Sequence, residues 1–301
     1  MKKHKICKIL LVILAIFLCV AFYELLGICV AYKKQPEVSN TTKKETKNGS
    51  WNECSENTER AVIIEKNPEA LLQRVRLIKN AKKEIILSTF AFQSDESGKL
   101  ILGALHDAAD RGVHIRLLVD GMESWIDMEG NPYFYGLSSH ENVEIKLYNK
   151  ANPLKPWKMM GRMHDKYLIA DGKRYILGGR NTYNYFLGDF PGHKNYDRDV
   201  LVVCDEPEKE NSVNQLSEYF ETIWEQEDSG YFHDNKKLAN RKSVKNAVLE
   251  LQNGYQKYFE ENKERICDTD YTDETFETEK IALVSNPIHT GPKEPVVWYQ
   301  L

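Results

Sequence analysis

Two features are missing from this 301-residue sequence, and each argues against a class of protein. Positive charge is not in excess, because 41 Lys and Arg residues stand against 45 Asp and Glu residues. A nucleic-acid binder usually carries a basic excess or stripe that neutralises phosphates. The six cysteines include no C-x-x-C pair, so the sequence predicts no metal framework. Cys204 ends an apolar run and is expected to be buried, whereas a Cys54–Cys267 disulfide has no support.

One long apolar segment is present at the N-terminus. It is unbroken from Ile9 to Tyr23 and continues to Tyr32 with Glu24 as its only charged residue, which is long enough to span a bilayer. Lysines on both sides favour a cytoplasmic N-terminus, so residues 1–34 are predicted to form a tip and a single-pass anchor. The protein would lie in the cell membrane with its catalytic domain outside the cytoplasm. A cleaved signal peptide is the rival interpretation, but no small-x-small site ends the run.

The remaining chain divides into a linker and a folded region. Residues 35–59 are polar and predict a flexible tether. Residues 60–280 alternate strand and helix patterns, which predicts an α/β fold whose sheet is covered on both faces. Expected strands are 61–64, 84–92, 113–119 and 143–148, and expected helices begin at Asn67-Pro68 and cover 97–111 and 213–224.

Three further segments carry predictions of their own. Residues 150–163 mix apolar and basic side chains, and they are either an ordinary surface loop or a lip that touches lipid. Residues 236–264 are mostly polar and are interpreted as an exposed helical excursion. Residues 281–301 begin with a strand followed by Asn-Pro, as residues 61–68 do, which indicates the truncated start of a second repeat.

The stretch that carries chemistry begins at His164 and Lys166. Side chains alternate along a strand, so these two project to the same side. Asp171-Gly172 predicts a two-residue hairpin turn, which returns residues 178–181 to the neighbourhood of His164. An imidazole can attack phosphorus directly while a lysine stabilises the phosphoryl oxygens, and this chemistry needs no metal ion or cofactor. Glycines leave room for a phosphate, and Asn181 offers amide donors.

These residues resemble the signature of the phospholipase D superfamily, which is H-x-K, four residues, Asp, six residues and Gly-Gly-x-Asn. The resemblance extends from about residue 60 to 204 and is closest to bacterial cardiolipin synthase-like members. It implies an α/β phospholipase D-like sandwich with a mixed central sheet. The implied catalytic residues are His164, Lys166, Asp171, Asn181 and Asp199, and the implied phosphate-binding residues are Lys166, Gly178, Gly179 and Asn181.

Within that resemblance the residues have different roles. His164 is expected to be the nucleophile or the general acid. Asp171 lies at a turn, which suggests a structural role. Asp199, in the Asp-Arg-Asp run at 197–199, best fits the acid that hydrogen-bonds the histidine and fixes its tautomer.

The departure from the family is that the chain holds only one signature. Family members pair two, with one histidine attacking and the other protonating the leaving group. The expected partner is therefore a second half with its own H-x-K, either the C-terminal half of a longer chain or a second copy in a homodimer. A single monomeric chain should be nearly inactive.

The leading functional hypothesis is a phospholipase D or cardiolipin synthase-like phosphatidyltransferase that acts on phospholipids at a membrane. The same chemistry would also suit an exported metal-independent nuclease, although the acidic balance argues against it. A membrane-tethered module that binds lipid head groups without turnover is the third hypothesis.

Overall fold

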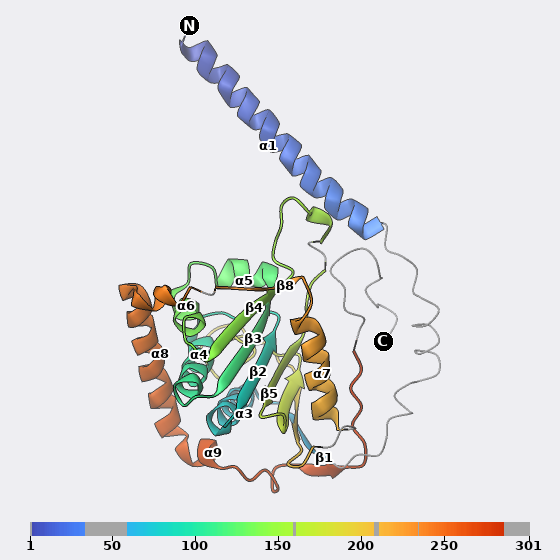
Figure 1. Cartoon of the computed structure of the whole chain (residues 1–301), viewed down its shortest axis with the longest axis vertical. Coiled ribbons are helices and arrows are strands. Elements are labelled where there is room, and N and C mark those ends of the chain that lie inside the picture. The colour runs from blue at the N-terminus through green and yellow to red at the C-terminus, as the bar shows by residue number, and fades with distance from the viewer. Residues whose placement is uncertain (1, 34–58, 159–160, 208–210, 234, 286–301) are drawn as a thin grey trace. The chain divides into compact units, whose positions relative to one another are not determined.

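The structure is a computed structural model that describes residues 2–33, 59–158, 161–207, 211–233 and 235–285 (Figure 1). The predicted linker, Cys54 and most of the predicted repeat at 281–301 lie outside these ranges. The chain forms two compact units. The first comprises residues 1–48, 151–162 and 285–301, and the second comprises residues 49–150 and 163–284.

The first unit contains the apolar N-terminal helix. Helix α1 (Lys2–Lys33) includes a stretch from Lys5 to Val30 that is long and apolar enough to cross a membrane. A signal sequence would have the same character, so the helix confirms the predicted secondary structure while anchoring stays a prediction. A short 3₁₀ helix, η2 (Pro156–Lys158), belongs to the same unit.

The second unit is built on a nine-stranded sheet in the order β8-β4-β3-β2-β5-β6-β7-β1-β9. The strands are β1 (Glu59–Ile64), β2 (Glu84–Thr89), β3 (His114–Asp120), β4 (Val143–Tyr148), β5 (Lys166–Ala170), β6 (Arg174–Gly178), β7 (Asp199–Val203), β8 (Ser229–Tyr231) and β9 (Phe276–Thr278). The β2–β3 and β3–β4 pairs are parallel and the other pairs are antiparallel. The predicted mixed central sheet is therefore confirmed.

Helices cover both faces of this sheet. They are α3 (Asn67–Asn80), α4 (Glu96–Asp110), α5 (Gly121–Asp127), α6 (Pro132–Ser138), α7 (Ser212–Trp224), η3 (Lys236–Asn240), α8 (Lys242–Glu261) and α9 (Lys263–Cys267). Strand β5 shows the alternation: Leu168 and Ala170 join the main core with α3 and α4, whereas the Tyr167 ring lies 6.5 Å from Phe220 of α7. Figure 1 shows α7 on the other side of the strands from α8, α4 and α6.

Two segments differ from their predictions. Helix α8 is not an exposed excursion, because it packs an apolar stripe against α4 and α6. The buried residues of this stripe are Val244, Ala247, Leu251, Tyr255 and Phe259. The segment is polar on average, and this obscured an apolar stripe whose residues recur at helical spacing. Helices α5 and α6 occupy a stretch for which no helix was expected, whereas the expected burial of Cys204 is confirmed.

Candidate active site

The β5–β6 hairpin forms as the sequence predicts. Asp171 and Gly172 have φ angles of 55° and 63°, in the left-handed region, and are the central residues of a turn that the Lys173 N–H closes onto the Ala170 oxygen at 3.0 Å. The first residues paired across the hairpin are Ala170 and Arg174. The Asp171 carboxylate accepts hydrogen bonds from the backbone N–H groups of Lys82, Lys83 and Glu84 at 2.7–3.2 Å. Asp171 lies five residues from Lys166 along the strand, which corresponds to about 17 Å. These contacts support the structural role that its turn position suggested.

The other signature residues converge at the opposite end of the hairpin. Lys166 pairs with Thr89 at the end of β2, and Gly178 pairs with Asp199 at the start of β7. Strands β2, β5, β6 and β7 are neighbours in the sheet, so these four positions lie along one edge. Neighbouring strands are about 4.8 Å apart, so Lys166 and Gly178 lie side by side, whereas Thr89 and Asp199 at the two ends of this row are about 14 Å apart.

His164 and Lys166 lie next to each other just before and at the start of β5. The Lys166 Nζ donates a hydrogen bond to the backbone oxygen of His164 at 2.7 Å. The imidazole of His164 contacts the Phe90 ring edge to face, with centroids 4.7 Å apart. Between them Asp165 points to the other side of the chain, where its carboxylate accepts a hydrogen bond from Tyr219 of α7 at 2.9 Å. The predicted alternation is therefore present, and His164 is exposed to solvent.

Burial lowers the pKa of the signature lysine. Lys166 is only 6% exposed, and this burial lowers the pKa of its ammonium group to about 8. The negative charges of Asp165 and Asp197 act in the opposite direction and favour the charged form. At neutral pH the ammonium is still mostly protonated, so it can stabilise a phosphoryl oxygen.

Asn181 is buried and held in place after β6. Its Oδ1 accepts a hydrogen bond from the Ala91 backbone N–H at 3.2 Å. The next residue, Thr182, donates its N–H to the Ala91 oxygen at 3.0 Å and accepts from Gln93 at 3.2 Å. The segment that carries Phe90 is thus tied to the segment that carries Asn181. This fixes the amide, with its donors at Nδ2, at the same edge as Lys166.

The two signature glycines accommodate carboxylates. A β-carbon at Gly178 would overlap the Asp199 carboxylate, and one at Gly179 would overlap the Asp197 carboxylate. Glycine was expected to make room for a substrate phosphate. Within the described structure this space is taken by protein oxygens, so phosphate binding at the two glycines stays a prediction.

Asp199 lies in a buried cluster with two arginines. Its Oδ2 is 2.8 Å from Arg74 of α3 and 3.3 Å from Arg180 of the signature, and its side chain is fully buried. Its Oδ1 has no hydrogen-bond partner among the described residues. Arg180 also donates to the backbone oxygens of Ile64 and Glu65. Asp199 therefore neutralises buried positive charge, and its predicted bond to the histidine stays untested.

Asp197 is the acidic residue that sequence reasoning passed over. It is exposed, its carboxylate lies against Gly179, and its charge acts on Lys166. The signal was present in the sequence, because the Asp-Arg-Asp run offers two carboxylates two residues apart. Which of the two carboxylates lies near Lys166 depends on the path of the long loop before β7, and the sequence pattern does not specify that path.

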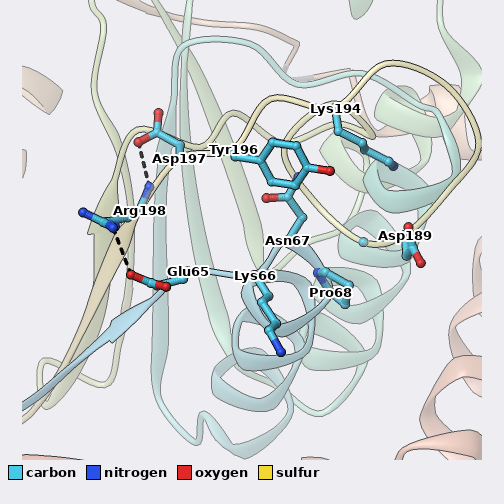
Figure 2. Close-up of a pocket in the computed structure, with 10 residues that line it drawn as sticks. Glu65, Lys66, Asn67, Pro68, Asp189, Lys194, Tyr196, Asp197 and Arg198 are labelled. Carbon is cyan, nitrogen blue, oxygen red and sulfur yellow. Dashed lines mark hydrogen bonds and ion pairs between the residues drawn. The ribbon is translucent and has the colours of Figure 1, made fainter.

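A cavity of about 710 Å³ that is lined mostly by charged and polar residues includes Asp197 in its wall (Figure 2). Its walls come from the start of α3 and from the loop before β7, with Arg198 bridging to Glu65 at 3.1 Å. Figure 2 shows Asp197 and Arg198 at one end and Asp189 and Lys194 at the other, with the Tyr196 ring between them. Asp197 thus lines the cavity and also acts on the charge of Lys166. Within the described residues, no group of three or more His, Cys, Asp or Glu side chains is arranged to hold a metal ion.

Comparison with known families agrees with this geometry. The family model described as "Cardiolipin synthase, PLD-like domain" matches residues 74–224, which is 151 of the 301 residues. The chain belongs to this phospholipase D-like family.

Individual relatives share part of the chain. A Helicobacter pylori (strain J99) protein is 30% identical over 212 residues, covering 65% of this chain and 39% of its own length. Cardiolipin synthase C of Escherichia coli (strain K12) is 29% identical over 171 residues, covering 52% of this chain and 34% of its own length. The chain thus spans well under half of these curated relatives.

Two solved structures were also similar. The phosphatidylserine synthase of Haemophilus influenzae Rd KW20 has a TM-score of 0.49 at 16% identity, covering 72% of this chain and 48% of the other. NucT from Helicobacter pylori has a TM-score of 0.44 at 16% identity, covering 59% of this chain and all of the other.

Proposed function

We propose that this chain is one half of a membrane-anchored enzyme that transfers a phosphatidyl group from a phospholipid. The observation that carries the proposal is the convergence of His164, Lys166 and Asn181 at one edge of the sheet. The apolar helix α1 supports a lipid substrate, because it would hold this edge near head groups.

In the proposed reaction His164 attacks the phosphorus of the head-group phosphodiester. A nitrogen–phosphorus bond forms as the bond from phosphorus to the leaving alcohol oxygen breaks, which leaves a phosphohistidine. Lys166 and the Asn181 amide donate to the phosphoryl oxygens as negative charge develops on them. A second histidine gives its proton to the leaving oxygen. It then takes a proton from water or an alcohol that releases the phosphatidyl group from His164.

The second histidine must come from elsewhere, because the sequence has one H-x-K. Either a second copy of the chain or a separate half with its own signature would supply it. Asp197 is proposed as the acid near the reacting groups, and Asp199 and Asp171 as residues that maintain the framework around them.

The function is tested with the full chain purified in detergent and mixed with phosphatidylglycerol micelles in the presence of EDTA. The expected result is release of glycerol, or transfer of the phosphatidyl group to added alcohol, once a second H-x-K half is provided by self-association or by addition. A parallel reaction receives single-stranded DNA. Cleavage of DNA with no lipid turnover would favour the nuclease instead, and no turnover of either substrate would favour a binding module.

The pKa of Lys166 predicts a pH dependence. Because the ammonium loses its proton near pH 8, we expect kcat/KM for the lipid to fall as pH rises through about 8. In the Lys166→Arg variant the fall should disappear, since a guanidinium stays charged, although activity should be lower. An unchanged falling limb in that variant would show that another group titrates.

The lowered pKa of Lys166 also makes the stability of the folded chain depend on pH. The folded value of about 8 lies below the ordinary 10.5, so between these pH values the unfolded chain binds more protons than the folded chain. Lys166 therefore costs stability below about pH 8, and this cost declines as pH rises toward 10.5.

A further inference from the structure

The segment that precedes the signature histidine is packed against the apolar helix within the first unit. Residues 151–158, called the docked loop below, contact α1 at two points. The Tyr23 hydroxyl donates a hydrogen bond to the Leu154 backbone oxygen at 2.8 Å. One turn further along, a β-carbon at Gly27 would overlap the Pro156 ring. Glycine at this position therefore allows the loop to approach the helix backbone closely.

The half-buried residues of α1 lie on the face that contacts the docked loop. Most of the apolar helix is exposed, but half-buried residues recur at Ala21, Glu24, Gly27 and Ile28. Spacings of three and four residues place these positions on one side of a helix. The contact is thus a stripe near the C-terminal end of the helix.

The position of the contact along α1 predicts its depth in a bilayer. The unbroken apolar run ends at Tyr23, and Glu24 is the only charged residue between Ile9 and Tyr32. Tyrosine is enriched where acyl chains meet head groups, and a carboxylate is expected to reach the polar layer. The docked loop therefore meets the helix in the last third of the Lys5–Val30 stretch, next to the residues of that stretch best suited to the boundary between acyl chains and head groups.

Side chains of the loop suit that boundary. Leu154 is 77% exposed and Trp157 is 38% exposed, although both are large and apolar. Lys155 directly follows Leu154 and Lys158 directly follows Trp157, a pattern that favours an anionic lipid surface. From Lys158 the chain continues for only six residues to His164.

We infer that the docked loop is an interfacial lip, held on α1 by Tyr23 and Gly27, that inserts Leu154 and Trp157 into the phospholipid layer. The inference rests on the proposed membrane anchor. It deepens the proposed function by assigning a lipid-contacting surface to the segment that leads into the catalytic strand.

The test reconstitutes the full chain in vesicles of phosphatidylcholine and phosphatidylglycerol with or without bromine on the acyl chains. The Trp157 contribution is the difference in fluorescence between the wild type and Trp157→Phe. We expect brominated lipid to reduce this contribution by at least about half, since bromine quenches indoles at the acyl boundary. The same difference for Trp224→Phe should be unaffected, because Trp224 is buried in the second unit.

Docking is tested with Gly27→Leu, which places a side chain where Pro156 lies, and with Cys29→Leu on the other side of the helix as its matched control. Quenching of Trp157 should be lost in the first variant and kept in the second. Quenching by aqueous acrylamide but not by brominated lipid in the wild type would overturn the lip and leave the anchor intact. Release of the chain from vesicles by alkaline carbonate would overturn the anchor and the lip together.

Discussion

Replacing His164 by alanine is expected to lower phosphatidylglycerol turnover by at least about a thousandfold in the active assembly, because the nucleophile is removed. Folding should be unaffected, since His164 is exposed. The measurement is the initial rate of glycerol release. His114→Ala is the matched control, because His114 starts β3 at the other end of the sheet from Lys166 and pairs with Glu144 at 3.0 Å.

Mixing the His164→Ala chain with the wild type distinguishes the two ways of completing the site. If two copies form one composite site that needs both histidines, random pairing of equal amounts leaves about a quarter of the pairs fully wild type. Activity would then fall to about a quarter. Independent chains, or chains that each recruit a separate half, would retain about half. A loss of less than tenfold in the fully substituted protein would contradict His164 as the nucleophile.

The second large effect is expected on stability, from Asp199→Ala. The substitution leaves Arg74 and Arg180 buried next to each other without their shared carboxylate. Removing one partner of a buried charge cluster typically costs about 3–5 kcal/mol. The measurement is the free energy of unfolding of the second unit from urea denaturation of the full chain. Asp205→Ala is the control, because Asp205 forms an exposed ion pair with Arg174, and it should cost less than about 1 kcal/mol.

Asp197→Asn separates the roles of the two neighbouring acids. Asp197 is exposed, so its stability effect should be small, while turnover should fall because its charge acts at Lys166. If Asp199→Asn instead kept full stability and lost turnover, the acid that serves the histidine would be Asp199, as the sequence pattern predicted. Because the asparagine keeps the shape of the side chain, this variant stays informative if the alanine variant does not fold.

The signature hairpin could be predicted because its determinants are local. Asp171-Gly172 specifies the turn within two residues, and strand alternation places His164 and Lys166 together without knowledge of the rest of the fold. The family model and the sheet edge agree with that reasoning. The parts that could not be predicted depend on distant contacts.

Distant contacts decide the roles of the acids and of α8. The Asp199 environment requires Arg74, which is 125 residues away in the sequence. The hydrogen bonds that Asp171 accepts come from Lys82 and Lys83 in the turn after α3 and from Glu84 at the start of β2, and no local sequence pattern predicts them. In α8 the buried apolar residues recur at every third or fourth position among many polar ones, so average polarity concealed a packing helix. The composition of a segment gives only its average polarity, whereas burial of a helix depends on whether its apolar residues line one face.

The short strand β9 bears on the exposed edge of the sheet. It pairs with β1 at the end of the sheet, and Arg60 reinforces the pairing through Glu277, Thr275 and Thr272. Without β9, the outer side of β1 would present unpaired N–H and C=O groups, and such an edge recruits strands from other molecules. The three residues from Phe276 to Thr278 thus cover the backbone groups of Glu59 to Ala61 on this edge. A shortened catalytic fragment should keep them if it is to remain dispersed at high concentration.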